Sequence, residues 1–340
     1  MNRIIIMGSA HQAALEHIYT KHLRALGNTV EIYPIQDLFL SYYTHSLFNK
    51  IIFRLGWSSI YAQLQKKVLS FVAKYEPSHI IVFKGMELLP ATLHIWKKKG
   101  IKLINYNPDN PFLFSGRGSG NENVSKSISL FDLYCSYDST IVKQLKDKGV
   151  KSALIPFGFE LDELEFQKIE NTPEINRVCF LGNPDKQRAQ FINSLINQQI
   201  AIDLYGNNWS QYIPSNSSSV KIHPPVYGLD FWKTLRRYAV QLNLMRIHNL
   251  NSHNMRSFDI PGVGGIMLAP RTADHQLYFE EGKEVFLFKD IEECVKSIHQ
   301  LLSMHKDMRT AIRSAARNKS VLNYTYKKQV ELLTVQINTL

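Results

Sequence analysis

The feature that most constrains the fold is the alternation of short apolar runs with longer helical stretches. The first half contains the runs RIIIM, TVEIYP, HIIVFKG, KLINYNP, LYCSYD and SALIPFG, each separated from the next by an amphipathic or polar stretch. Apolar runs that are bounded by Gly or Pro and alternate with helices are typical of buried parallel strands. The sequence therefore predicts an α/β fold with doubly wound parallel sheets.

The alternation stops once, in a polar segment over about residues 160–176, and restarts with VCFLG, AIDLYG and VQLNLMR. A chain of 340 residues accommodates two domains. We predict a first Rossmann-like domain over residues 1–158 and a second over 175–323, with 159–174 as the linker. A C-terminal helix, about 324–340, is expected to complete the first domain. Ligands of such sheets bind at the carboxyl ends of the strands, so the predicted site is a cleft between two facing domains.

The charge balance of the chain limits the classes of partner that it is expected to bind. The formal net charge is +11 and the pI is near 9.4, which favours anionic partners such as nucleotide phosphates or an acidic membrane face. No nucleic-acid module is recognisable, so no nucleic acid is expected. The three cysteines lack metal-ligand spacing. No run reaches the ~18 apolar residues of a membrane span and no signal peptide is recognisable, so we expect a cytoplasmic protein.

Two loops of the first half could carry chemistry. In MGSAHQ, Gly8 and Ser9 leave the first strand and enter a helix, which suits either a ligand loop or a plain tight turn. The full GxGxxG pattern is absent. Asp109 lies between two prolines in a long loop and could orient or deprotonate a hydroxyl, or simply cap a turn. Arg117 in the same loop could close over a ligand.

The second half carries more cations at loop positions. In FLGNPDKQRAQF, Gly182 ends a strand, and Lys186 and Arg188 lie in the first turn of the next helix. The helix dipole disfavours cations there, so either an anionic ligand reconciles the arrangement or the charges are solvated.

The densest group of polar residues is LMRIHNLNSHNMRSFDIPGVGGIML. Arg246 ends a strand, and Arg256 and Asp259 precede the glycines. These glycines enter a strand instead of leaving one, which is the wrong order for a Walker loop or a dinucleotide fingerprint. Asp259 could accept hydrogen bonds from a ribose diol, or it could pair with Arg256 or Arg246. The chain has no Asp-x-Asp pair, so no metal site is predicted and cations would neutralise a diphosphate.

These motifs resemble a known group of enzymes. VCFLGNPDKQRAQF, IDLYGNNW, VQLNLMR and RSFDIPGVGG, followed by IMLAP, YFEEGKE and VFLF, are similar to the CgeB-type (spore maturation protein-like) glycosyltransferases near family four. The resemblance covers about residues 178–302, with a looser match at YNPDNPF. It implies a GT-B fold, with a nucleotide-sugar donor bound by the second domain and an acceptor bound by the first. It also implies that no metal is essential.

The resemblance also implies residue roles. Asp259 matches the acid that holds the ribose. Asn251 stands where relatives carry an acid near the donor sugar, and Arg188 matches an arginine near the diphosphate. The backbone of Gly264 and Gly265 would approach the donor phosphates.

The predicted function is therefore a metal-independent, retaining glycosyltransferase of bacterial cell-surface polysaccharide biosynthesis. Its donor is a UDP-, GDP- or dTDP-sugar, and its acceptor is a glycan, a lipid-linked molecule or a protein. No cofactor is expected. Arg188 and Asp109 are the candidate catalytic residues, the latter for acceptor handling. The alternatives are a nucleotide-sugar epimerase or isomerase on the same fold and a sugar-nucleotide binding protein without turnover.

One helical stretch has a second possible role. A long helical stretch is predicted over about residues 46–75, and residues 42–68 mix aromatic, aliphatic and cationic side chains. This segment either lies on an anionic membrane surface, at the inner face, or simply covers the sheet as an amphipathic helix.

Overall fold

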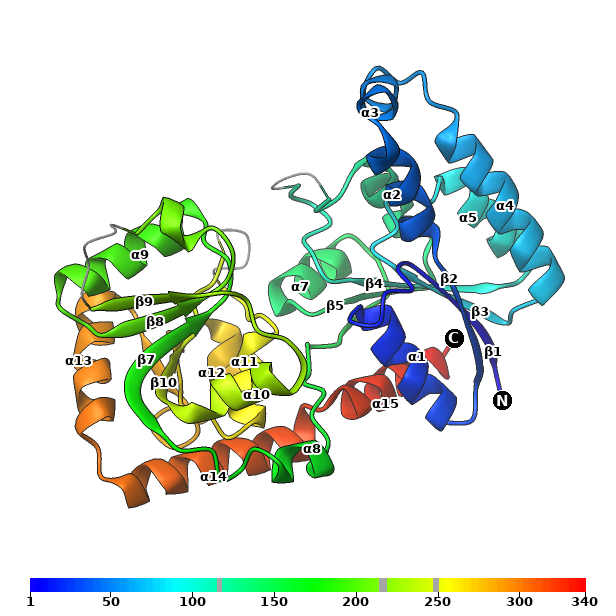
Figure 1. Ribbon diagram of the computed structural model, residues 1–340. Helices are drawn as coiled ribbons and strands as arrows, with labels where there is room; N and C mark the ends of the chain where they lie inside the picture. The colour runs from blue at the N-terminus through cyan, green and yellow to red at the C-terminus, as the bar shows by residue number, and fades with distance from the viewer. Residues whose placement is uncertain (115–117, 214–218, 247–250) are drawn as a thin grey trace. The chain divides into compact units, whose positions relative to one another are not determined.

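The computed structural model describes residues 1–114, 118–213, 219–246 and 251–340, and it divides into two compact units (Figure 1). Unit 1 comprises Met1–Pro156 and Gln329–Leu340, and unit 2 comprises Phe157–Lys328. Residues 159–174, which the sequence assigned to a linker, belong to unit 2 and include helix α8 (Glu163–Gln167). Arg117 lies outside the described residues.

Unit 1 is built on a six-stranded parallel sheet of order β2-β1-β3-β4-β5-β6. The strands are β1 (Arg3–Met7), β2 (Thr29–Tyr33), β3 (His79–Phe83), β4 (Lys102–Asn107), β5 (Leu133–Ser136) and β6 (Ser152–Leu154). The helices are α1 (Leu15–Ala25), α2 (Ile35–His45), α3 (Leu47–Arg54), α4 (Ile60–Tyr75), α5 (Pro90–Lys98), α6 (Glu122–Ser127), α7 (Ser139–Asp147) and most of α15 (Tyr326–Ile337). The central strands β1, β3, β4 and β5 are mostly apolar and are buried beyond their first residues, because helices cover both faces of the sheet.

The helical stretch predicted over residues 46–75 consists of two helices, α3 and α4. The chain between them contains Gly56, whose φ of 75° is left-handed, so the helix cannot continue through it. As a result α3 is a separate helix that packs on α2, and Figure 1 shows it at the end of unit 1's helical extension, away from the strands.

Unit 2 is built on a second six-stranded parallel sheet, of order β12-β11-β10-β7-β8-β9. The strands are β7 (Ile175–Leu181), β8 (Ile202–Tyr205), β9 (Val220–His223), β10 (Tyr238–Leu242), β11 (Met267–Pro270) and β12 (Phe286–Phe288). The helices after α8 are α9 (Lys186–Asn197), α10 (Gly228–Arg237), α11 (Arg256–Gly262), α12 (Ala273–Tyr278), α13 (Ile291–Ser303) and α14 (Lys306–Asn323).

The strand order of unit 2 reverses direction at β7. The chain moves from β7 to β8 and β9 on one side, and then returns to β10 on the other side. Loops that follow β7 and β10 therefore diverge, which leaves a crevice at the carboxyl ends of these two strands. A ligand site of unit 2 is therefore expected among the loops that follow Leu181 and Leu242.

Candidate functional site

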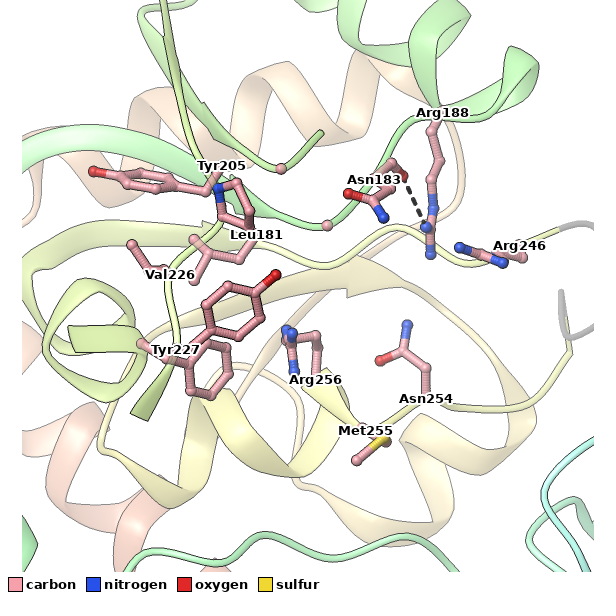
Figure 2. Close-up of a pocket in the computed structure, with 14 residues that line it drawn as sticks. Leu181, Asn183, Arg188, Tyr205, Val226, Tyr227, Arg246, Asn254, Met255 and Arg256 are labelled. Atoms are coloured by element: carbon pink, nitrogen blue, oxygen red, sulfur yellow. Dashed lines mark hydrogen bonds between the residues drawn. The ribbon is translucent and has the colours of Figure 1, made fainter. Parts of the chain in front are cut away.

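A cavity of about 400 Å³ lies at this switch point of unit 2 (Figure 2). Leu181 ends β7 and Tyr205 ends β8, so the cavity opens at the carboxyl edge of the sheet. Its lining comes from the loops after these strands, the loops after β9 and β10, and the starts of α9, α10 and α11: Leu181, Gly182, Asn183, Arg188, Tyr205, Gly206, Pro225, Val226, Tyr227, Phe231, Arg246, Asn254, Met255 and Arg256. The structure thus brings together Gly182, Arg188, Arg246 and Arg256 from the predicted set.

Arg188 is fixed by the start of α9. The carboxylate of Asp185 caps this helix by accepting a hydrogen bond from the Arg188 amide at 3.0 Å. The guanidinium donates to the carbonyl oxygens of Leu244 at 2.7 Å and Asn183 at 3.3 Å, and the second of these bonds is drawn in Figure 2. Its Nε is buried and has no hydrogen-bond partner among the described residues. Burial and the nearby Arg246 charge lower the pKa of Arg188 to about 10.

Arg256 enters the cavity from the start of α11. Its Nη1 donates to Asp259 at 2.6 Å, and its guanidinium carbon lies 4.3 Å from the centre of the Phe231 ring. Asp259 itself is buried behind Arg256 and does not line the cavity. Burial raises the pKa of Asp259 to about 6, although the Arg256 charge opposes that rise. Asp259 therefore acts on the cavity through Arg256.

The cavity gathers three arginines, and the acids that pair with two of them lie outside its lining. Arg256 pairs with Asp259 at 2.6 Å, and Arg188 Nε lies 3.7 Å from the Asp185 carboxylate. Arg246 is exposed at the cavity wall, and the charges of Arg246 and Arg256 both lower the pKa of Arg188. None of the side chains that line the cavity is acidic. Guanidinium groups that repel one another in a partly buried space are stabilised when an anion with several oxygen acceptors binds between them. The arrangement is suited to a phosphate or diphosphate.

Asn254 is a cavity residue that the motif reading missed. Its side chain accepts from the Ser257 amide at 3.2 Å, while the Ser257 hydroxyl accepts from the Asn254 amide at 3.2 Å. This reciprocal pair closes the turn that leads into α11, and an Asn three residues before a Ser is the sequence spacing that permits it. Asn243 in turn accepts from the Asn254 amide group at 2.8 Å, which fixes the orientation of Asn254 beside Arg256.

Tyr227 was also missed. It is 75% exposed at the cavity rim, immediately before α10. A free aromatic face beside an anion site can stack on a base or a sugar, but no local sequence pattern marks this residue.

Two predicted donor residues lie outside the cavity lining. Lys186 is the exposed first residue of α9, and Asn251 is exposed in the turn that precedes α11. The neighbouring Ser252 and His253 are held inside unit 2 by Asp274, whose carboxylate lies 2.6 Å from the Ser252 hydroxyl and 2.9 Å from His253 Nδ1. The amide of Asn251 is thus left facing solvent.

Gly264 and Gly265 are not at the cavity. They follow the end of α11 and precede β11, so they lie at the amino edge of the sheet, opposite the cavity. Gly264 has a φ of +69°, and its carbonyl accepts from Arg236 at 2.8 Å. A Cβ on Gly265 would lie 2.9 Å from the Ile260 carbonyl oxygen. The prediction that the backbone of Gly264 and Gly265 approaches the donor phosphates does not fit this position. These glycines instead permit close packing of α11 on the sheet.

Gly8 and Ser9 lie at the carboxyl end of β1 in unit 1, but their loop is surrounded by acids. The Ser9 amide donates to Glu16 at 2.9 Å, and the Ser9 hydroxyl and the Ala10 amide donate to Asp37 at 2.8 and 2.7 Å. Backbone donors that bind carboxylates are not available to a diphosphate, which the same carboxylates repel. The predicted role of this loop toward the donor phosphates is therefore not supported by its geometry.

Asp109 pairs with Lys84, a residue that the sequence reading missed. The Lys84 ammonium lies 2.6 Å from the Asp109 carboxylate, and Lys84 has a left-handed φ of 60° directly after β3. Glu87 follows three residues later and is 8% exposed; burial raises its pKa to about 7, with Lys84 opposing the rise. Unit 1 thus carries two carboxyl groups, Glu87 and Asp109, in the segments that follow β3 and β4.

Comparisons with known proteins agree with this architecture. Residues 186–334 match the model of a family described as glycosyl transferase-like. No curated protein sequence gives a significant match. Sucrose-phosphate synthase from Thermosynechococcus elongatus superposes with a TM-score of 0.69 at 11% identity, over 100% of this chain and 99% of that chain. Anabaena HepE in complex with UDP gives 0.66 at 12% identity, over 100% of both chains. UDP-GlcNAc 2-epimerase from Neisseria meningitidis gives 0.59 at 11% identity, over 100% of both.

These likenesses confirm the predicted GT-B fold, with its two parallel six-stranded sheets. The narrower CgeB-type assignment stays a prediction. Within the described part of the chain, no helix has both the length and the apolar character that crossing a membrane requires.

Proposed function

We propose that this chain, for which the family match and the fold support a glycosyltransferase, binds a nucleotide-sugar donor in the cavity of unit 2 and transfers the sugar. The observation that carries the proposal is the convergence of Arg188, Arg246 and Arg256 in a cavity whose lining includes no acid. UDP is the first donor base to test, because the Anabaena HepE structures contain UDP and UDP-glucose.

The three arginines would stabilise the departing nucleoside diphosphate. Charge develops on the leaving diphosphate as the glycosidic bond breaks, and cations that are already held in place stabilise that charge with little reorganisation. Arg188 and Arg256 are both held in place, the first by two backbone carbonyls and the second by Asp259 and Phe231. With cations in this role, we propose a transfer that needs no metal and no cofactor.

Two roles remain open to experiment. We propose that Asp259 positions Arg256, and direct contact of Asp259 with the ribose stays a prediction. Acceptor handling belongs to unit 1 in this proposal, with Asp109 as the first candidate base and Glu87 as its competitor, because a carboxyl group with a pKa of about 7 suits proton transfer near neutral pH. Loss of turnover in Asp109→Asn but not Glu87→Gln, with donor affinity retained, would select Asp109.

The acceptor we propose is a cell-surface glycan, a lipid-linked molecule or a protein, with the enzyme in the cytoplasm. Retention of configuration and the CgeB-type assignment complete the proposal. Their support is the resemblance of residues 178–302, and the stereochemistry of a purified product tests the first of them.

A nucleotide-sugar epimerase is the second candidate, because UDP-GlcNAc 2-epimerases share the fold. An epimerase changes the configuration of the sugar with no acceptor present, either on the nucleotide or with release of the free sugar. Chromatography of the sugars after incubation without acceptor therefore separates the two candidates: an epimerised sugar, bound or free, favours the epimerase, and the unchanged sugar with free nucleoside diphosphate favours slow transfer to water.

The function is tested by titrating purified protein with UDP-, GDP- and dTDP-sugars in a calorimeter and by measuring donor hydrolysis with and without EDTA. We expect one nucleotide class to bind, and hydrolysis to continue in EDTA. If no sugar nucleotide binds or turns over, the proposal is wrong. Binding that Arg188→Gln and Arg256→Gln leave unchanged would place the donor outside this cavity.

A further inference from the structure

Helix α3 exposes an apolar stripe to solvent. Leu47 is 76% exposed, Phe48 67%, and Trp57, just after the helix, 76%. Ile51 and Leu55 are also exposed. Positions 47, 51 and 55 are four residues apart and positions 48 and 55 are seven apart, so these side chains share one helix face. Contiguous exposed apolar side chains of this kind mark a surface that binds something.

The stripe is held rigidly in place. The other face of α3 inserts Phe53 among aromatic rings of α2 and α4, with ring centres 5.0 Å from Phe39 and 5.6 Å from Tyr61. The Asn49 side chain donates to the Tyr42 carbonyl at 2.8 Å, and the Ser58 hydroxyl donates to the Tyr42 hydroxyl at 2.8 Å. The apolar face is therefore exposed on an anchored helix, and exposure is not a consequence of fraying.

The charge around the stripe has one sign. Residues 38–75 contain no Asp or Glu, whereas Lys50, Arg54, Lys66, Lys67 and Lys74 all lie in this segment. A cavity of about 300 Å³ between α2, α3 and α4 is lined partly by His45, Asn49 and Lys67, which are polar partners for a phosphate group. An apolar stripe flanked by cations complements an anionic lipid surface, where the apolar groups enter the interface and the cations meet headgroups.

A second copy of the chain fits this surface less well. A symmetric dimer through α3 places the same patch on both sides of the interface, so Lys50 and Arg54 would face their own counterparts without an acid to pair with them. The charge pattern therefore favours the membrane over self-association.

We propose that α3 and the link to α4 dock unit 1 on a membrane of anionic phospholipids, with Phe48, Ile51 and Trp57 in the interface. Lys50 and Arg54 contact the headgroup phosphates. The docking is peripheral and does not depend on the proposed glycosyl transfer, so either can fail without the other. It would keep the enzyme beside acceptors that are confined to a membrane.

The test uses flotation of the full chain with vesicles of phosphatidylcholine alone or of phosphatidylcholine with phosphatidylglycerol. We expect flotation with the anionic vesicles, weakened at high salt. Phe48→Ser/Ile51→Ser/Trp57→Ser should reduce binding at least about tenfold for each lost anchor. Lys50→Gln/Arg54→Gln should reduce it about fivefold per charge.

A matched control replaces exposed apolar residues of unit 2, Leu164→Ser/Leu277→Ser, which are 71% and 61% exposed. It should float like the wild type. Trp57 offers a second readout, because Trp96, Trp209 and Trp232 are buried: its fluorescence should shift to the blue with anionic vesicles. The proposal is overturned if the wild type does not float or if the α3 variant floats equally well. It is also overturned if size-exclusion chromatography shows a dimer that the α3 substitutions dissociate, while vesicles bind neither protein.

Discussion

Arg188→Gln should weaken donor binding while leaving the free protein as stable as before, or slightly more stable. The native structure holds this cation in an unfavourable place, buried and close to two other arginines. A bound diphosphate would relieve that cost. A residue whose removal harms binding and spares stability is typical of a functional site, where stability is given up for affinity.

The magnitudes follow from the contacts. The fall in the pKa of Arg188 from 12.5 to about 10 corresponds to about 3 kcal/mol of unfavourable environment for the charged form. Its removal leaves the Leu244 and Asn183 carbonyls without this donor, at about 1 kcal/mol each. The substitution should therefore stabilise the free protein by about 1 kcal/mol, which would raise Tm by about 2 to 4 °C. If solvent screens the charges, Tm should stay unchanged. Losing charged hydrogen bonds to a diphosphate costs about 1.5 to 3 kcal/mol, or about 10- to 150-fold in Kd.

Thermal unfolding of the free variant and calorimetric titration with the preferred sugar nucleotide measure the two effects. Arg313→Gln is the matched control. Arg313 is also buried, with a pKa lowered to about 10, but it bonds Tyr238 O and Glu174 at 2.7 Å, away from the cavity. We expect the control to lose stability, because it leaves Glu174 with one arginine fewer, and to keep its donor affinity. Unchanged donor affinity in Arg188→Gln, or a Tm that falls by several degrees, would refute the reasoning.

Other consequences can be measured separately. Asp259 has a pKa of about 6, so its negative charge beside Arg256 is lost as pH falls through 6. Affinity for a sugar nucleotide should then rise by up to about fivefold between pH 7 and 5, and Asp259→Asn should bind tightly at both pH values; a parallel pH profile in both proteins contradicts this. His275 is buried with a pKa lowered to about 4, so the unfolded chain takes up a proton first as pH falls below about 6.5. Up to about 3 kcal/mol of stability should be lost between pH 6.5 and 4, and urea unfolding of His275→Asn should show a flatter profile. Gly265→Ala should lose about 1 to 3 kcal/mol of stability with no change in donor Kd, and a selective loss of affinity would restore a role at the phosphates.

Much of the fold could be predicted from the sequence because strands and helix ends depend on local residue patterns. The run RIIIM became β1, and the acid before KQRAQF became the cap of α9, since strand burial and helix capping depend on neighbours within a few residues. The order of the glycines and the strand after Asp259 already placed Gly264 and Gly265 at the amino edge of a parallel sheet. Only the resemblance assigned them to phosphates, and the structure follows the order instead.

The candidate site was harder to predict because its side chains come from loops that follow different strands of the sheet. Arg188 follows β7 and Arg246 follows β10. The first residues that pair between these strands, Ile175 and Tyr238, are 63 positions apart in the sequence (238 − 175), so only the strand order makes them neighbours. Likewise, no local pattern shows that Lys84 after β3 meets Asp109 after β4. The sequence by itself determined two parallel sheets, some helix starts such as that of α9, and a surplus of positive charge. Only the tertiary structure decided which arginines gather in one cavity, and that carboxylates occupy the amides after β1, because both depend on the strand order and burial that bring distant side chains together.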